Sequence, residues 1–268
     1  MISLNHYLTQ LSYRYHLGRK KEEKNRIDAS IRNLRKKLKR DLGDKIHEDF
    51  VFGSYKRGTI LPRSVDKKSD VDLMIVFNHT AYERTPLTYR RWLREFAERN
   101  YKRSTIKRSH PSITLRLGAI DYDLVPARYE KRFWEIGSYY IPNEVKDGWR
   151  STNPNDVKEA LVQANVRHNS TIKPVIRLLK AWNAKSGHPY DSYKLELAIT
   201  RMHFWHSTVS ENFYQAVNQL TPAWRDSQSK KNKVESLKKN VAKAQDYLRV
   251  GNRERAISWL HRSLPKHK

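Results

Sequence analysis

The sequence predicts an α+β protein in which a mixed β-sheet with flanking helices is followed by an all-helical half. Short runs rich in Val, Ile and Phe, typical of strands, alternate with amphipathic helices up to about residue 142. The composition then changes across a stretch that contains Gly148 and Pro154. Beyond this stretch, the apolar residues recur at helical spacing. We therefore expect two domains, residues 1–150 and 151–268.

Length and composition limit the class of protein. The 268 residues suffice for one or two domains with a sizeable core. The 54 basic and 28 acidic residues give a net charge of +26, which fits a polyanionic partner and, equally well, a basic solvated surface. The absence of cysteine excludes disulfides, thiolate metal sites and cysteine nucleophiles, and it fits a reducing cytoplasm.

Targeting and membrane segments are not expected. Polar residues interrupt the first seventeen positions, so no signal peptide is predicted. Apolar runs all fall short of the roughly 20 residues that a membrane span needs. We expect a cytoplasmic protein without a membrane partner.

In the first half, apolar spacing and Gly or Pro punctuation indicate both helices and strands. Gly43 is a natural stop for one helix, and Pro86 suits the first turn of another. The predicted helices are 3–17, 20–42 and 85–102. The predicted strands are 46–52, 70–77, 112–117, 119–126 and 133–141, with a polar loop over 55–69.

The predicted helix 20–42 has one apolar stripe and a basic remainder. The stripe comprises Ile27, Ile31, Leu34 and Leu38 at helical spacing. Basic side chains crowd its other faces: Arg32, Arg35, Lys36, Lys37, Lys39 and Arg40. Such a pattern usually marks a solvated outer face, and the functional alternative is a surface that binds phosphates.

The second half is predicted to be entirely helical. The expected helices are 155–166, 171–186, 192–208, 210–219, 231–250 and 252–263. The polar, basic segment 228–239 is expected to be a mobile connection.

Three acidic residues suggest a metal site. Residues i and i+2 of a strand point to the same face, so Asp70 and Asp72 project together. Adjacent carboxylates repel each other unless a cation lies between them, and oxygen ligands suit Mg²⁺ or Mn²⁺. Asp123 is the candidate third ligand, from a neighbouring strand. Three carboxylates can hold the two ions used for phosphoryl displacement, although an isolated Asp-x-Asp pair is usually a turn or a surface strand.

Gly53 and Ser54, which end the predicted strand before this pair, add phosphate-binding chemistry. Gly53 has no Cβ and lets a phosphate approach the backbone closely. Ser54 offers a hydroxyl and a backbone N–H to phosphate oxygens. The turn, the acidic pair and the third acid, in this order, indicate a nucleotide-transfer site much more specifically than any one of them does alone.

Together these motifs resemble the DNA polymerase β-like nucleotidyltransferase superfamily. The segments that carry the resemblance are Gly53-Ser54, Ser69-Asp70-Val71-Asp72 and Asp123-Leu-Val-Pro-Ala127. The segments Ile172–Asn183 and Ser192–Glu196 resemble the helical half of the oligoadenylate synthase and cyclic GMP-AMP synthase group. The link between the halves resembles that of the bacterial CD-NTases of CBASS antiphage defence, and the resemblance is carried by Tyr140–Pro142, Gly148-Trp149 and Thr152–Pro154. The resemblance covers roughly residues 45–208 and implies a nucleotidyltransferase palm, an all-helical C-terminal lobe and an active site in the cleft between them.

The resemblance also implies roles for individual residues. Asp70, Asp72 and Asp123 would bind two Mg²⁺, which Mn²⁺ can replace, and Asp123 would help to activate the attacking 3′-hydroxyl. Gly53 and Ser54 would hold the incoming triphosphate.

From the helical lobe, Lys180 and Ser192 would reach the triphosphate and Tyr193 would stack on the base. Each residue also has a purely structural alternative. Lys180 could be a solvent-facing lysine, Ser192 a helix cap and Tyr193 a core aromatic. Asp121 shares a face with Asp123 and is an alternative ligand. The family pattern favours Asp123, which leaves Asp121 as an auxiliary acid or an arginine partner.

The implied function is synthesis of a cyclic di- or trinucleotide signal from ATP, GTP or other nucleoside triphosphates. The signal would act on a downstream effector in antiviral defence. Structured or double-stranded RNA on the helix 20–42 is the candidate activator, read by shape and phosphates. The rival functions are an RNA 3′-end nucleotidyltransferase of the CCA- or poly(A)-adding type and a catalytically silent RNA-binding protein.

Overall fold

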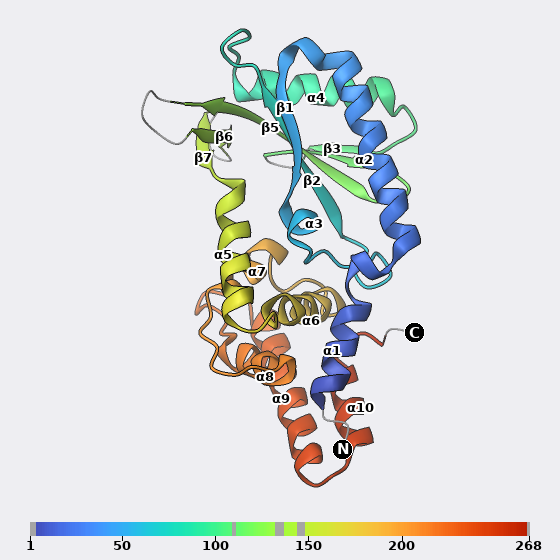
Figure 1. Cartoon of the computed structure of the whole chain (residues 1–268), viewed down its shortest axis with the longest axis vertical. Helices are drawn as coiled ribbons and strands as arrows, with labels where there is room; N and C mark the ends of the chain where they lie inside the picture. Colours follow the sequence, from blue (N-terminus) through green and yellow to red (C-terminus); the bar gives the residue numbers. More distant parts are fainter. Residues whose placement is uncertain (1–3, 109–110, 132–136, 144–147, 267–268) are drawn as a thin grey trace. The chain divides into compact units, whose positions relative to one another are not determined.

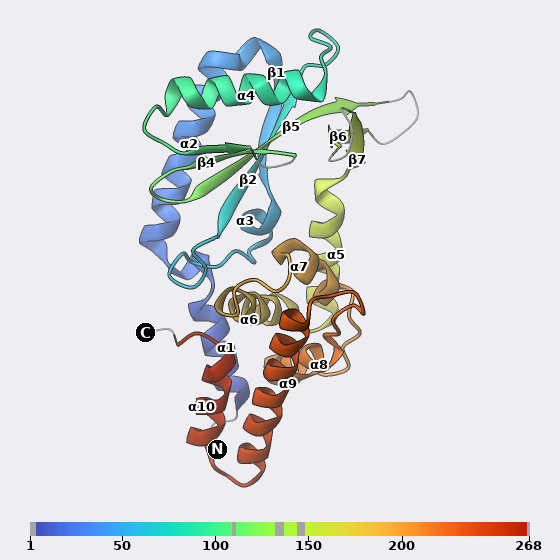
Figure 2. The same ribbon diagram turned by 180° about the vertical axis from the view of Figure 1, so that it is seen from behind.

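The chain forms two compact units, which we describe separately. A computed structural model of the chain describes residues 4–108, 111–131, 137–143 and 148–266 (Figures 1 and 2). The sheet unit comprises Lys20–Arg57 and Ser69–Asp156. The helical unit comprises Met1–Arg19, Gly58–Lys68 and Val157–Lys268. Two segments that precede residue 150 in the sequence therefore belong to the helical unit. The domain bounds 1–150 and 151–268 stay a prediction.

The sheet unit is built on one mixed sheet of seven described strands. The strands are β1 (Ile46–Phe52), β2 (Asp70–Phe77), β3 (Ile106–Arg108), β4 (Ile113–Arg116), β5 (Asp121–Glu130), β6 (Ser138–Pro142) and β7 (Trp149–Thr152). Their order is β1-β2-β5-β4-β3, and β6 pairs with β5 and β7. Of these pairs only β2 and β5 run parallel. This mixed sheet confirms the predicted fold class.

The two faces of the sheet differ in chemistry because strand residues alternate. On β2, Val71 and Phe77 lie on the face that helices cover. Phe77 stacks on Tyr89 of helix α4 (Pro86–Asn100), with ring centroids 4.3 Å apart. On β5, Tyr122 is the register partner of Val71, and its hydroxyl donates to the Ile27 carbonyl of helix α2 (Lys21–Leu42) at 3.4 Å. Asp72, one position on from Val71, therefore lies on the opposite face.

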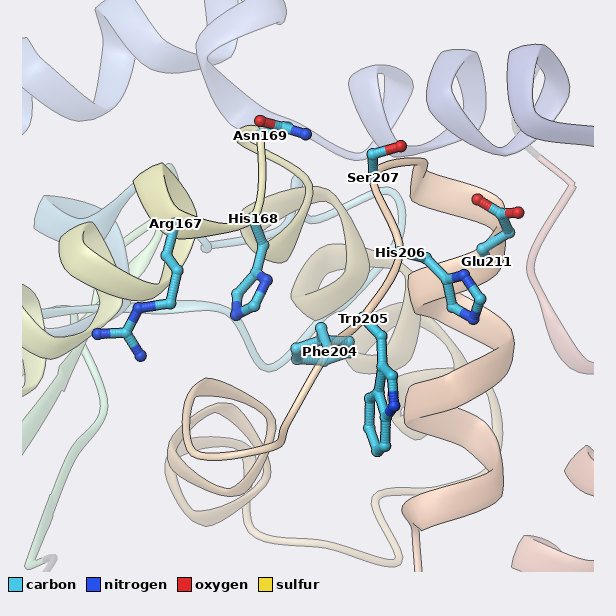
Figure 3. A pocket seen from close by; sticks show the side chains of 8 residues that line it. All are labelled: Arg167, His168, Asn169, Phe204, Trp205, His206, Ser207 and Glu211. Carbon is cyan, nitrogen blue, oxygen red and sulfur yellow. The ribbon is translucent and has the colours of Figure 1, made fainter.

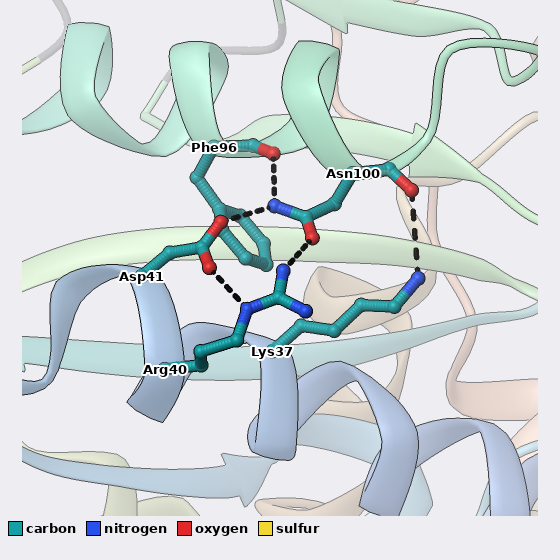
Figure 4. Close-up of polar contacts among 5 residues, drawn as sticks. All are labelled: Lys37, Arg40, Asp41, Phe96 and Asn100. Carbon is teal, nitrogen blue, oxygen red and sulfur yellow. Dashed lines mark hydrogen bonds and ion pairs between the residues drawn. The ribbon is translucent and has the colours of Figure 1, made fainter.

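Helices α2 (Lys21–Leu42) and α4 (Pro86–Asn100) carry the apolar stripes that the sequence predicts. The stripe of α2, from Ile27 to Leu38, is buried, and α4 lies across the strands in the view of Figure 2. Asn100 joins the two helices (Figure 4). Its amide nitrogen donates to Asp41 Oδ2 at 2.6 Å and to the Phe96 carbonyl at 3.0 Å, and its amide oxygen accepts from Arg40 at 2.6 Å.

The helical unit buries one continuous apolar core. Its helices are α1 (Leu4–Arg14), η1 (Leu17–Arg19), α5 (Pro154–Arg167), α6 (Ile172–Lys185), α7 (Ser192–Thr200), α8 (Val209–Gln219), α9 (Gln228–Arg249) and α10 (Arg253–Ser263). The short elements η2 (Gly43–Lys45) and α3 (Gly53–Arg57) belong to the sheet unit. In the core, Leu8 and Leu11 of α1 join the same cluster as Trp182 of α6 and Phe213 of α8. These contacts explain why the N-terminal helix belongs to this unit.

Some element predictions were wrong. The predicted helix 192–208 ends at Thr200, because side chains of α8 bind the backbone that follows: Gln215 and Gln219 both donate to the His203 carbonyl, at 2.8 and 2.9 Å. The polar segment 228–239 belongs to α9, whose residues Val234 and Leu237 are buried at helical spacing.

Two short strands went unpredicted. The linker-like stretch after Gly148 contains β7, which pairs with β6, and β3 pairs with β4. Only the end of the predicted strand 133–141 can be compared, because residues 132–136 lie outside the described ones. None of the helices that the structure describes combines the length and hydrophobicity needed to cross a bilayer.

Candidate functional site

The acidic residues gather at one end of the two parallel strands. Asp72 of β2 is the register partner of Asp123 of β5, and Asp70 is the partner of Asp121. Both pairs lie on the face opposite α2 and α4. All four carboxylate residues are half-buried. The third acid that the sequence placed fifty residues away is therefore directly beside the Asp70–Asp72 pair.

The turn before β2 is shaped around Asp72. Gly53 begins α3 with φ +66°, in the left-handed region that favours glycine. A Cβ on Gly53 would lie 1.7 Å from Asp72 Oδ2. A glycine is therefore required here by both the backbone angle and the carboxylate, and Ser54 follows it in α3.

A hydrogen-bonded chain anchors this turn to α2. Tyr55, next to Ser54, donates its hydroxyl to Asp28 of α2, and Lys24 binds Asp28 Oδ2 at 2.5 Å. Burial acts to raise the pKa of Asp28, but the hydrogen bonds from Lys24 and Tyr55 outweigh it and hold that pKa below its usual value. Burial and the bond to Asp28 raise the pKa of Tyr55, which therefore stays a donor. Sequence reasoning missed this chain because nothing in the local pattern links positions 28 and 55.

The two acids on β5 have different partners. Thr114 of β4 donates its hydroxyl to Asp123 Oδ1 at 2.6 Å, which orients the carboxylate. Asp121 Oδ2 lies 3.4 Å from Arg116 Nε. Asp121 is thus an arginine partner, one of the two roles expected for it. Thr114 was also missed, because only the β4–β5 register brings it beside Asp123.

The donor set and its register fit a divalent cation. Carboxylates from adjacent strands offer the hard oxygen ligands that Mg²⁺ and Mn²⁺ prefer. Gly53 leaves open the space beside the Asp72 carboxylate that a Cβ would fill. As the side chains stand, no three acidic or histidine residues of the described ranges form a group able to hold a metal ion. The assignment of Asp70, Asp72 and Asp123 as metal ligands therefore stays a prediction.

In the helical unit, Lys180 of α6 is buried beside Glu196 of α7. Its ammonium lies 3.6 Å from Glu196 Oε2, and the hydroxyl of Thr59 donates to the same oxygen at 2.8 Å. Sequence reasoning had placed Lys180 on the triphosphate and had given Glu196 no role. The role of Lys180 toward triphosphate stays a prediction.

Ser192 and Tyr193 begin helix α7. The cap is Asp191, whose side chain accepts from the Lys194 backbone N–H at 2.8 Å, so Ser192 occupies the first helical position. Tyr193 is 50% exposed and is therefore not a core aromatic. An exposed ring at a helix start suits base stacking, which stays a prediction for this residue.

A separate pocket of about 480 Å³ opens in the helical unit. Figure 3 shows its lining, which comprises Arg167, His168, Asn169, Phe204, Trp205, His206, Ser207 and Glu211. Burial and the nearby Arg167 lower the pKa of His168. The lining contains none of the predicted site residues, so this pocket is not the predicted nucleotide site.

The mixed sheet, the acidic strand ends and the glycine turn define the class of the protein, a nucleotidyltransferase fold of the polymerase β-like superfamily. The family model described as "Second Messenger Oligonucleotide or Dinucleotide Synthetase domain" matches residues 2–165. The chain belongs to this family. The resemblance to the CD-NTases that the motifs carried is thereby confirmed.

Known proteins similar to the chain agree with this assignment. A cyclic AMP-AMP-AMP synthase of Acinetobacter sp. is 29% identical over 147 residues, which are 53% of this chain and 41% of that protein. A probable cyclic nucleotide synthase of Bacillus cereus is 30% identical over 98 residues, which are 36% of this chain and 30% of that protein. The chain thus spans less than half the length of the curated relatives it matches.

Solved structures share the fold over nearly the whole chain. The structure of Escherichia coli MS115-1 CdnC with ATP is 13% identical, covers 97% of this chain and 96% of its own, and has a TM-score of 0.65. The structure of Bradyrhizobium diazoefficiens CdnG with GTP is 15% identical, covers 97% and 98%, and also has a TM-score of 0.65.

Proposed function

We propose that this protein is a metal-dependent nucleotidyltransferase that joins nucleoside triphosphates into a cyclic di- or trinucleotide. The observation that carries the proposal is the β2–β5 register, which sets Asp72 beside Asp123 and Asp70 beside Asp121 on one face. Family membership supports the same chemistry. The proposed setting is antiviral defence in the cytoplasm, with the cyclic product acting on a separate effector.

Asp70, Asp72 and Asp123 would hold two Mg²⁺ or Mn²⁺. Bound there, the ions would supply charge neutralisation for an in-line phosphoryl transfer that releases pyrophosphate. Thr114 keeps the Asp123 carboxylate oriented for its second proposed task, activating the attacking 3′-hydroxyl. Gly53 and Ser54 bind triphosphate oxygens with backbone N–H groups and a hydroxyl.

The helical unit would contribute to nucleotide binding through Tyr193, Ser192 and Lys180. Tyr193 offers an exposed ring to the base, and Ser192 offers donors at the N-terminus of α7. Of the three residues, Lys180 would act least directly on the nucleotide, because its ammonium lies beside the Glu196 carboxylate.

One experiment separates the candidate functions. The protein is incubated with the four labelled nucleoside triphosphates and Mg²⁺ or Mn²⁺, with and without RNA, and the products are treated with phosphatase. A small phosphatase-resistant product supports the proposal. Label on the RNA would instead identify a 3′-end nucleotidyltransferase, and no incorporation would leave only RNA binding.

Two variants and a control test the acidic site. Asp70→Asn and Asp72→Asn should abolish product formation because each removes a charged oxygen ligand. Both variants should leave the fold intact, because asparagine has nearly the same shape as aspartate, and a Tm measured on the same samples checks this. Asp44→Asn changes an exposed acid outside the site and should leave the rate unchanged. Full activity in the Asp70→Asn/Asp72→Asn double variant would contradict the site assignment.

The partner we propose is structured or double-stranded RNA on α2. Arg32, Lys36 and Lys39 are exposed and fall on one stripe at helical spacing. The same helix carries Asp28, which holds Tyr55 of the glycine turn. A polyanion along α2 would therefore act on an element bonded directly to the proposed phosphate-binding turn.

The RNA proposal is tested by adding double-stranded RNA at low and moderate salt and following both binding and product. Binding that weakens with salt, and a product yield that rises with RNA, would support it. Charge reversal at Arg32 and Lys36 should remove the stimulation and leave the RNA-independent rate intact. RNA binding that does not change with salt, together with a product yield that does not change with RNA, would contradict the proposal.

A further inference from the structure

The segment Gly58–Lys68 follows α3 directly in the chain but belongs to the helical unit. Ile60 and Leu61 are buried, and Leu61 joins the core cluster of that unit. The chain thus leaves the proposed phosphate-binding turn at Arg57 and enters the core of the helical unit within a few residues.

Two polar contacts hold the beginning of this segment. Arg177 of α6 is buried and donates to the Gly58 carbonyl at 3.1 Å and to the Ser12 carbonyl at 3.1 Å. The next residue, Thr59, donates its hydroxyl to Glu196 Oε2 at 2.8 Å. Both Thr59 and Glu196 have 0% exposed surface.

A buried carboxylate is costly unless it is paired and hydrogen-bonded. Glu196 meets both conditions, because Lys180 lies 3.6 Å from the oxygen that Thr59 binds. Glu196 is also three residues after Tyr193 in α7, so the two side chains lie within one helical turn. One carboxylate therefore joins the segment after the glycine turn to the helix that carries the proposed base-stacking ring.

We infer that Glu196 is a positioning residue whose buried carboxylate anchors Thr59, and with it the chain after the Gly53–Arg57 turn, to helix α7. The inference rests on the proposed function, since the turn and Tyr193 matter for nucleotide binding only if the protein binds nucleoside triphosphates. Lys180 then serves this anchor by balancing the charge of Glu196.

Thr59→Val is the decisive variant, since it removes the hydroxyl and keeps the shape. We expect it to raise the KM for nucleoside triphosphate about tenfold with a much smaller change in kcat, because the chain that follows the turn is no longer held before substrate binds. Thr59→Ser restores the hydroxyl and should return KM to within about twofold of the wild type.

Thr200→Val is the matched control. Thr200 is a buried threonine on the same helix, and its hydroxyl donates to the Glu196 backbone carbonyl, also at 2.8 Å. Its loss removes a buried threonine hydrogen bond of the same length, to a backbone carbonyl, without touching Gly58–Lys68. KM should therefore stay at the wild-type value in Thr200→Val.

Amide hydrogen exchange without nucleotide measures the anchor independently of activity. Exchange over residues 58–61 should be faster in Thr59→Val than in the wild type or Thr200→Val, and exchange in α9 and α10 should be unchanged. Equal exchange and equal KM in Thr59→Val and the wild type would overturn the inference, as would failure of Thr59→Ser to restore them. If the wild type makes no product from any triphosphate, the proposed function fails, and the exchange comparison still decides whether the anchor exists.

Discussion

Replacing Gly53 by alanine tests how closely the turn is matched to the acidic site. The new Cβ would lie 1.7 Å from Asp72 Oδ2, whereas ordinary contacts begin near 3.4 Å. The carboxylate oxygen must therefore move by more than 1 Å. Misplacing a reacting group by about 1 Å can cost roughly 100-fold in rate, so we expect kcat to fall about 100-fold in Gly53→Ala.

The same substitution also strains the backbone, because Gly53 has φ +66°. A left-handed L-residue costs about 1–2 kcal/mol. In a protein of this size that cost lowers the Tm by about 2–8 °C. The loss of rate should thus be far larger than the loss of stability can explain.

Two glycines supply the controls. Gly251 has φ +75° with no atom within 4 Å of its Cβ position, so Gly251→Ala isolates the backbone strain. Gly118 has neither a positive φ nor a neighbour within 4 Å, so Gly118→Ala should be close to neutral. The assay is steady-state product formation at saturating triphosphate, with the Tm measured on the same samples. A wild-type kcat in Gly53→Ala, or an equal kcat loss in Gly251→Ala, would refute the reasoning.

Three further predictions each concern a single residue. Thr114→Val removes the 2.6 Å hydrogen bond to Asp123 and should lower kcat about tenfold with little change in Tm. An unchanged kcat would show that the Asp123 carboxylate does not need this hydrogen bond to be oriented. Asn100→Ala removes the hydrogen bonds that link α2 to α4 and should lower the free energy of unfolding in urea by about 1–2 kcal/mol. It should not alter product formation. Burial, together with the charges of Arg177, Arg19 and Lys173, lowers the pKa of His16 to about 4 in the folded protein. Between about pH 6.5 and pH 4 the unfolded chain therefore binds more protons than the folded one. Stability is therefore lost as the pH falls from 6.5 toward 4, and His16→Gln should lose less Tm than the wild type over that range.

Much of the architecture could be predicted because it depends on local pattern. The buried stripe of α2 and the start of α4 at Pro86 follow from apolar spacing and from the fixed φ of proline. The end of α7 at Thr200 could not be predicted. It depends on Gln215 and Gln219, which bind the following backbone from another helix.

For the site, the sequence by itself determined which residue types are available for the proposed chemistry. The alternation of a strand places Asp70 and Asp72 on one face, and the glycine before Ser54 implies a close approach of the backbone. These properties depend only on neighbouring residues. The resemblance to the superfamily also needed the segment Asp123-Leu-Val-Pro-Ala127, and the family pattern made Asp123 the expected third acid.

Only the tertiary structure decided which side chains meet. The parallel register of β2 and β5 sets Asp72 beside Asp123, and the antiparallel register of β4 and β5 sets Arg116 beside Asp121. Packing within the helical unit brings Thr59 to Glu196, 137 positions apart in the chain, and gives this glutamate its proposed role as an anchor. Sequence distance carries no information about such contacts, because they form only when separate elements pack into one core.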